Sequence, residues 1–106
     1  MEETEFMGLA ERALERIEAA LEASAPDADV ERKEGGVLEI EFSDRSRMVI
    51  NRHGAAREIW VAARSGGYHF RWDGSAWRDT REGGELFSVL SRLVSAQSGG
   101  TIELRP

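Results

Sequence analysis

The sequence predicts a single α+β domain spanning residues 1–106, built as a two-layer α/β sandwich. Three observations predict it. Helical periodicity marks both ends of the chain, period-two alternation fills the middle, and the turns between alternating segments are too short for helices. Two amphipathic helices need apolar cover, and one sheet face can supply it for both. We therefore expect two roughly antiparallel helices on one face of a five- to six-stranded antiparallel sheet, whose other face stays open.

The first helix is expected from about Thr4, its predicted N-cap, to Ala23. Its apolar residues recur at three- and four-residue spacing and form one stripe: Phe6, Leu9, Ala13, Ile17 and Leu21. The segment SAPDAD ends the helix, because proline disfavours a helical residue before it.

Short alternating segments follow. DVERKE is a polar segment typical of an edge strand, and VLEIEF directs Leu38, Ile40 and Phe42 to one face. After the turn SDRS, RMVIN sends Met48 and Ile50 inward. Three more strands are predicted in REIWVAA, GYHFRW and AWRDT, because RSGG and DGS are good hairpin connections.

Helical spacing returns at Leu86, Val89, Leu90, Leu93 and Val94, between a Gly-Gly pair and the segment SGG. The tail TIELRP is expected to lie extended along the domain.

Composition excludes several classes of protein. The chain has no cysteine, so disulfides and thiolate chemistry are absent, and no apolar run approaches the roughly 18 residues of a membrane span. The acidic start MEETEF is unlike a signal or transit peptide, and a cytoplasmic location is expected. No H-E-x-x-H, G-x-S-x-G or P-loop motif is present, so we expect no enzyme, and His69, between Tyr68 and Phe70, is interpreted as a structural sheet residue.

Charge is unevenly distributed. Residues 1–31 carry a net charge of −8 and residues 32–106 carry +2. Such a field repels nucleic acid and anionic lipid and attracts cations and basic partners.

Acidic residues line one side of the predicted first helix. At 100° per residue, Glu11, Glu15, Glu18 and Glu22 fall within roughly a 60° arc away from the apolar stripe. Three further acids alternate beyond the helix and share one side if that segment is extended: Asp27, Asp29 and Glu31. This acidic ridge is either a solvated helix face, a weak site for hard cations, or a surface that docks a basic protein.

Trp60 breaks the alternation of its strand. Ile59, Val61 and Ala63 point to the core, so the indole lies on the open face. It is either a packing residue or an interface anchor, with Asn51 and the region of Arg52 and His53 as its polar rim.

Four segments together resemble the frataxin family, in its bacterial CyaY branch. They are EFMGLAERALERIEAAL, GGVLEIEFSDRSRMVINR, EIWVAARSGGYHF, and a tryptophan followed by DTREGGELFSVLSRLV, and they span essentially the whole chain. The resemblance implies the same sandwich fold and an accessory role in iron–sulfur cluster assembly.

The resemblance also implies ligands and partners. Iron, as Fe2+ or Fe3+, would bind weakly to surface carboxylates, as would other hard cations, and the protein would attach to the cysteine desulfurase and iron–sulfur scaffold. Carried over by position, the metal ligands are Glu11, Glu15, Glu18, Glu22, Asp27, Asp29 and Glu31, with Glu3 as a weaker candidate. The partner site is Asn51, Arg52, His53 and Trp60.

Two functions stay open at this point: an iron-binding accessory protein, and a purely regulatory ligand of the desulfurase whose acids serve docking. A monomer is expected, with iron-dependent oligomerisation as an alternative. The sequence departs from the family at His53, where glutamine is common, and at the alanines that end the first helix, which predict weak, salt-sensitive iron binding. The short tail predicts little cover over the groove between the helices.

Overall fold

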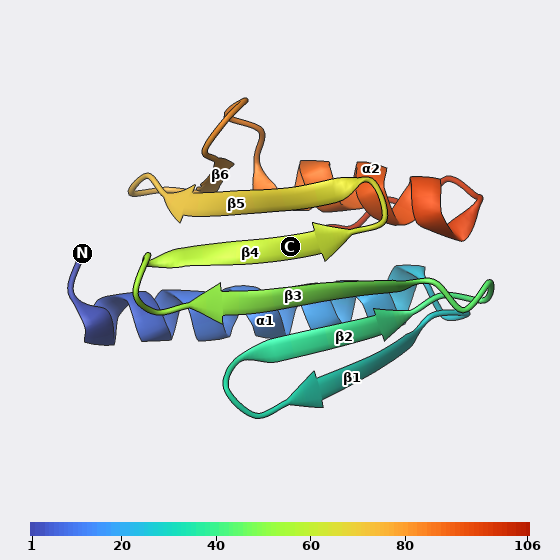
Figure 1. The fold of residues 1–106 in the computed structure, drawn as a ribbon, viewed down its shortest axis with the longest axis horizontal. Coiled ribbons are helices and arrows are strands. Elements are labelled where there is room, and N and C mark those ends of the chain that lie inside the picture. The colour runs from blue at the N-terminus through green and yellow to red at the C-terminus, as the bar shows by residue number, and fades with distance from the viewer.

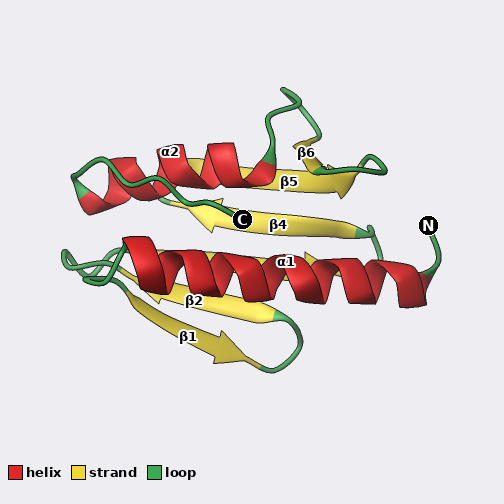
Figure 2. Ribbon diagram, turned by 180° about the vertical axis from the view of Figure 1, so that it is seen from behind, coloured by secondary structure: helices red, strands yellow, loops and turns green.

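In a computed structural model that describes residues 1–106, two helices and six strands form a sandwich of two layers (Figure 1). The order along the chain is α1 (Glu3–Ser24), β1 (Asp29–Lys33), β2 (Val37–Glu41), β3 (Arg47–His53), β4 (Glu58–Ala63), β5 (Gly66–Trp72), β6 (Trp77–Asp79) and α2 (Leu86–Ser98). The sheet is an antiparallel meander in the order β1-β2-β3-β4-β5-β6. Both helices cover the same face, which confirms the predicted fold class (Figure 2).

The relative direction of the helices was predicted wrongly. They run in the same general direction, not antiparallel, and both end at the same side of the molecule (Figure 1), where a hollow is lined by Ser24 and Ser98. The cause is the connection after β6. The chain turns back at once, so that Glu85 forms an antiparallel bridge with Arg78, and it reverses again to enter α2.

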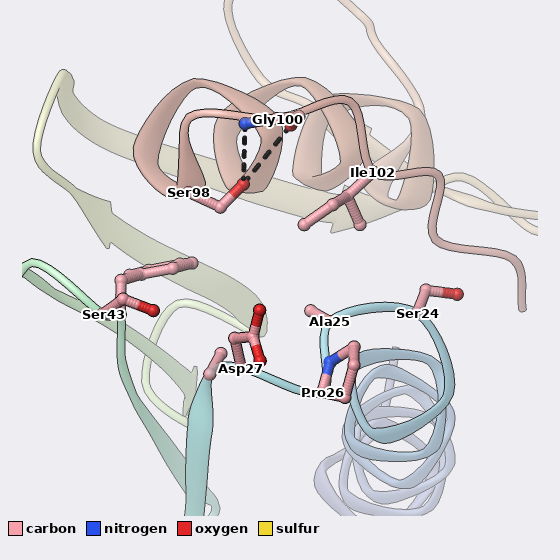
Figure 3. A pocket seen from close by; sticks show the side chains of 10 residues that line it. Ser24, Ala25, Pro26, Asp27, Ser43, Ser98, Gly100 and Ile102 are labelled. Atoms are coloured by element: carbon pink, nitrogen blue, oxygen red, sulfur yellow. Dashed lines mark hydrogen bonds between the residues drawn. The ribbon is translucent and has the colours of Figure 1, made fainter.

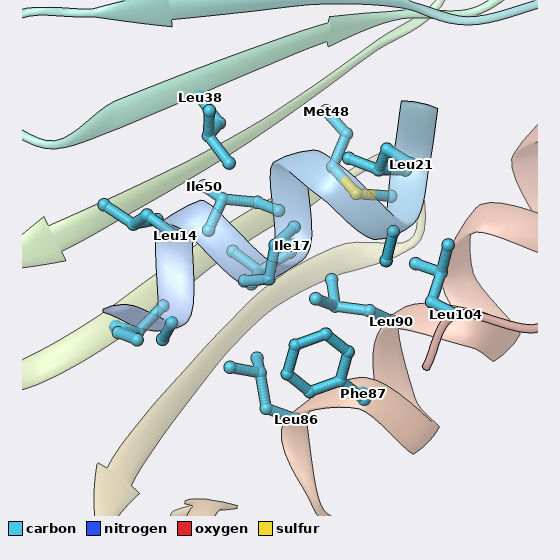
Figure 4. Close-up of a cluster of buried hydrophobic side chains, with 14 of the residues drawn as sticks. Leu14, Ile17, Leu21, Leu38, Met48, Ile50, Leu86, Phe87, Leu90 and Leu104 are labelled. Atoms are coloured by element: carbon cyan, nitrogen blue, oxygen red, sulfur yellow. The ribbon is translucent and has the colours of Figure 1, made fainter. Parts of the chain in front are cut away.

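The core lies between the helices and the covered sheet face (Figure 4). Phe6, Ala13, Ile17 and Leu21 of the predicted stripe are buried, while Leu9 is partly buried at the edge. The inward residues of the strands are buried as the alternation predicted: Leu38, Ile40, Met48, Ile50, Ile59, Val61 and Phe70. Fully burying one such side chain stabilises the fold by about 1.5–3 kcal/mol, so this layer holds the sheet to the helices.

The helix ends differ in how they are capped. Helix α1 begins one residue before the predicted cap, after Glu2, whose side chain makes no capping hydrogen bond. The carboxylate of Glu85 accepts hydrogen bonds from the backbone N–H groups of Phe87 and Ser88 and so caps α2. Gly99, with φ of 83°, ends α2 in the left-handed conformation that favours glycine.

The C-terminal tail is fixed between the two helices (Figure 2). The hydroxyl of Ser95 accepts a hydrogen bond from the N–H of Ile102 at 2.8 Å, and that of Ser91 accepts one from Leu104 at 2.8 Å. Leu104 is buried in the core, so even this short tail covers part of the groove. Neither helix is both long and apolar enough to cross a membrane.

Candidate functional site

Of the four glutamates predicted to form the acidic ridge on α1, two are paired with an arginine of the neighbouring strand and two are not. Arg32 of β1 faces the helix, forms an ion pair with Glu11, and contacts Glu18 at 3.3 Å. Glu11 is also 3.6 Å from Arg52 of β3. Glu15 and Glu22 are exposed and make no ion pair. Two of these four glutamates are therefore already paired with cations of the protein itself.

The remaining predicted metal ligands are dispersed. Asp29 and Glu31 are exposed and alternate with Val30 and Arg32, which face the helix, so these two acids lie on the open face of the sheet. Asp27 lies in the loop after α1. Glu3 begins that helix, about 30 Å from its other end at 1.5 Å per residue. No three histidine, aspartate or glutamate side chains converge into a group that could hold a metal ion.

On the open face, two pairs of acids stand directly opposite each other. Asp29 pairs with Glu41 and Glu31 with Glu39 across β1 and β2. Like charges in this position are destabilising, and two cations reduce the effect: Lys33 is 3.2 Å from Glu39, and Arg47 is 3.4 Å from Glu41. Asp29 and Glu31 therefore lie on the opposite face from the glutamates of α1 and do not form one ridge with them. Glu39 and Glu41, which the sequence did not identify as site residues, lie beside them.

Trp60 lies near the centre of the open face, held between two histidines. His53 stacks on one side, with ring centroids 3.7 Å apart, and His69 on the other, at 4.4 Å; both pairs are nearly parallel, at 11°. The register of β3, β4 and β5 explains this, because Asn51, Trp60 and His69 stand side by side and His53 lies two pairs along β3, on the same face. Trp60 and His53 are partly buried, and His69 is exposed.

The predicted partner residues divide between the two faces. Asn51 lies beside Trp60, as predicted, and its amide donates to the carbonyl of Arg52 at 3.2 Å. Arg52 was wrongly placed on this face. Strand alternation turns its side chain toward α1, where it packs over Gly36, whose φ is 75°, and reaches Glu11. A Cβ at Gly36 would lie 2.6 Å from the Arg52 side chain, so only glycine permits this path.

Both histidines also correct the sequence analysis. His53 lies beyond the predicted strand segment RMVIN, and it is the last residue of β3. His69 was interpreted as a structural residue, and its half-exposed ring instead stacks on Trp60. Strand alternation alone places His69 on the open face, because it lies between Tyr68 and Phe70 of the covered face. That His69 stands beside Trp60 follows only from the register of β4 and β5.

Glu58, two residues before Trp60 on β4, holds the indole through a hydrogen bond, and the sequence did not identify it as a site residue. Its side chain is only 7% exposed and accepts a hydrogen bond from Trp60 Nε1 at 2.8 Å. It also forms an ion pair with Arg71, and its Oε1 lies 3.8 Å from Nδ1 of His69. Burial by itself raises the pKa of the Glu58 carboxyl, but the hydrogen bonds from Trp60 and Arg71 and the charges of Arg71 and His69 outweigh it. The pKa therefore lies below its ordinary value of 4.5.

A lowered pKa makes Glu58 a source of acid sensitivity. The carboxylate stabilises the fold fully above pH 4.5, and this contribution is lost as the pH falls through the lower pKa of the folded protein. We expect Glu58→Gln to reduce the free energy of unfolding at pH 7 by about 1–2 kcal/mol, since charge-assisted hydrogen bonds are lost. Urea unfolding at pH 7, 5 and 3 measures this. The difference from wild type should shrink toward pH 3, and an equal difference at all three values would contradict the role assigned to the ionised form.

Together these features define the class of protein: a two-layer sandwich of two helices on one face of an antiparallel sheet, with an acidic first helix and an aromatic cluster on the bare sheet face. The chain belongs to the frataxin family, since residues 1–100 match the model of the frataxin-like domain.

Named relatives support this membership. An iron-sulfur cluster assembly protein CyaY of Dechloromonas aromatica (strain RCB) is 61% identical over 105 residues, 99% of this chain and 100% of that protein. A protein of the same name from Cupriavidus metallidurans is 50% identical over 108 residues, covering 99% of this chain and 97% of the relative. The solved structure of frataxin from Psychromonas ingrahamii superposes with a TM-score of 0.90 at 29% identity, covering all of both chains.

Proposed function

We propose that this chain is an accessory protein of iron–sulfur cluster assembly, not an enzyme. It binds iron weakly through surface carboxylates and docks on the cysteine desulfurase–scaffold complex, to supply iron, to regulate cluster formation, or both. The observation that carries the proposal is the 61% identity, over nearly the whole chain, to a protein named for this process. The residues that would perform it are the acids of α1 and the Trp60 cluster.

The acids of α1 suit a weak and reversible iron site. Carboxylate oxygens are the ligands that hard cations prefer, and Glu15 and Glu22 are free to take them. Asp27 extends this set beyond the end of the helix. Because these groups are exposed and form no closed cage, the ion would keep most of its water and would be displaced by salt. Iron held in this way is a cargo that can be passed on.

The free carboxylates should carry the iron affinity. We expect Glu15→Gln combined with Glu22→Gln and Asp27→Asn to reduce iron binding by tenfold or more, measured by titration under anaerobic conditions. The matched control is Glu82→Gln, which removes one exposed charge from the loop between β6 and α2. Equal affinity of the triple variant and the wild type would count against iron binding at this helix.

Arg32 should limit that affinity. Arg32→Gln releases Glu11 and Glu18 and removes a neighbouring positive charge. Exposed ion pairs are each worth about 0.2–1 kcal/mol, so we expect iron affinity to rise roughly two- to fivefold. Titration of the variant beside Lys33→Gln, which removes a charge on the opposite face, separates a local effect from one of net charge. No change, or the same change in both variants, would contradict the assignment.

The second candidate is a purely regulatory ligand of the desulfurase, with no role in iron supply. The pairing of Glu11 and Glu18 with Arg32 favours it, because ligands already bonded to an arginine are poor iron ligands. In this case the acids of α1 serve to attract a basic surface and to orient it, which mainly raises the association rate. The triple variant would then dock more slowly, and iron would leave docking unchanged.

A further inference from the structure

A hollow of about 260 Å³ opens where both helices end (Figure 3). Asp27 and Ser43 point into it from the loops beside the sheet, and Ser98 and Ile102 face them from the end of α2 and the tail. The parallel course of the helices creates this arrangement, because it brings both C-terminal ends to one place.

The hollow is surrounded by negative charge. The C-terminal end of each helix carries a partial charge of roughly −0.5, and neither helix has a basic residue in its last turn. Arg64 is the cation that reaches the end of α2, donating to the carbonyl of Ala96 at 3.5 Å, and it is already paired with Asp44 at 2.9 Å. The Asp27 carboxylate makes no ion pair or hydrogen bond within the chain.

The floor of the hollow is apolar. Ala25 and Phe42 are buried beneath it, and Ile102 packs against the core at its side. The hydroxyl of Ser43 lies at the rim beside the carboxylate, whereas that of Ser98 is already hydrogen-bonded to the backbone N–H and carbonyl of Gly100 (Figure 3). A ligand that fits both parts has an aliphatic stem and a single compact cation that donates several hydrogen bonds, which describes a lysine side chain.

We propose that this hollow is a docking pocket for a lysine side chain of a basic partner protein. The ammonium group lies between the carboxylate of Asp27 and the hydroxyl of Ser43, and the methylene stem lies on Phe42 and Ile102. The identity of the partner rests on the proposed function, whereas the chemistry of the pocket does not. Charge complementarity favours this occupant, because residues 1–31, which include Asp27, carry a net charge of −8 and attract basic surfaces.

The pocket can be tested without the partner, by titrating the isotopically labelled protein with Nα-acetyl-lysine N-methylamide and following its amide resonances. We expect saturable shifts confined to the ends of the helices and the loop around Ser43. Asp27→Asn should weaken binding about fivefold, the upper range for an exposed ion pair, whereas Glu103→Gln should leave it unchanged. Ser43→Leu, which fills the hollow with an apolar side chain, should abolish binding while the remaining spectrum stays that of a folded protein.

Tetramethylammonium at equal concentration tests whether charge alone is recognised, since it cannot donate a hydrogen bond. Shifts that spread over all acidic side chains, that tetramethylammonium reproduces, or that Asp27→Asn leaves unchanged would overturn the proposal. Such a result would leave the proposed function standing, because docking through Trp60 and iron binding by α1 are measured separately.

Discussion

Replacing Trp60 with alanine should weaken binding to the cysteine desulfurase–scaffold complex by about 2 kcal/mol or more, roughly 30-fold in Kd. The indole is the largest apolar group on the open face of the sheet, and tryptophans in such positions dominate many interfaces. The stack makes the effect larger than the area of one side chain suggests. His53 and His69 both stack on the indole between them, so its removal also takes away the support of the two histidine rings.

The control for this variant is Trp60→Phe, which keeps an aromatic ring between the histidines but loses the hydrogen bond to Glu58. It should retain most of the affinity for the complex. Iron binding should be equal in wild type and both variants, because the indole is on the opposite face of the sheet from α1. Binding measured by biolayer interferometry decides the point: an unchanged Kd for a folded Trp60→Ala protein would remove the sheet face from the docking surface.

Replacing Leu104 with alanine should produce the largest loss of stability that a change in the tail can cause. The side chain is 3% exposed and packs between the helices, and truncation of buried leucine to alanine costs about 2–5 kcal/mol. We expect about 2–3 kcal/mol here, because the site is at the edge of the core, and a decrease of roughly 10 °C or more in Tm.

Thermal and urea unfolding measure this effect, with Glu103→Ala as the neighbouring control on the exposed side of the tail. The control should change stability by less than about 0.5 kcal/mol. Equal, small effects of the two substitutions would mean that the tail lies on the surface without stabilising the groove between α1 and α2.

The fold could be predicted from local patterns because each element has a clear period. The stripe from Phe6 to Leu21 and the alternation in VLEIEF each specify one buried face, and the short turns leave no room for a crossover. The direction of α2 could not be predicted in this way. It depends on the double reversal between Asp79 and Leu86, which is a property of one irregular loop and has no periodic signal.

The candidate site was predicted in part for a similar reason. Trp60 was found because it violates an alternation within its own strand. His69, Glu58 and Arg71 were not found, because their roles depend on the register between strands, and the ion pairs of Arg32 depend on how α1 crosses β1. Contacts between residues far apart in the sequence produce no local pattern from which they could be predicted.

If this chain docks on the cluster assembly complex as proposed, it should alter the rate at which the complex forms clusters. The most direct measurement is the rate of cluster formation on the purified scaffold by the purified desulfurase, with increasing amounts of this protein and at several iron concentrations. We expect a rate that changes saturably with the concentration of this protein, changes less with Trp60→Ala, and depends on the iron concentration. A rate that is identical with and without the protein at every iron concentration would contradict it.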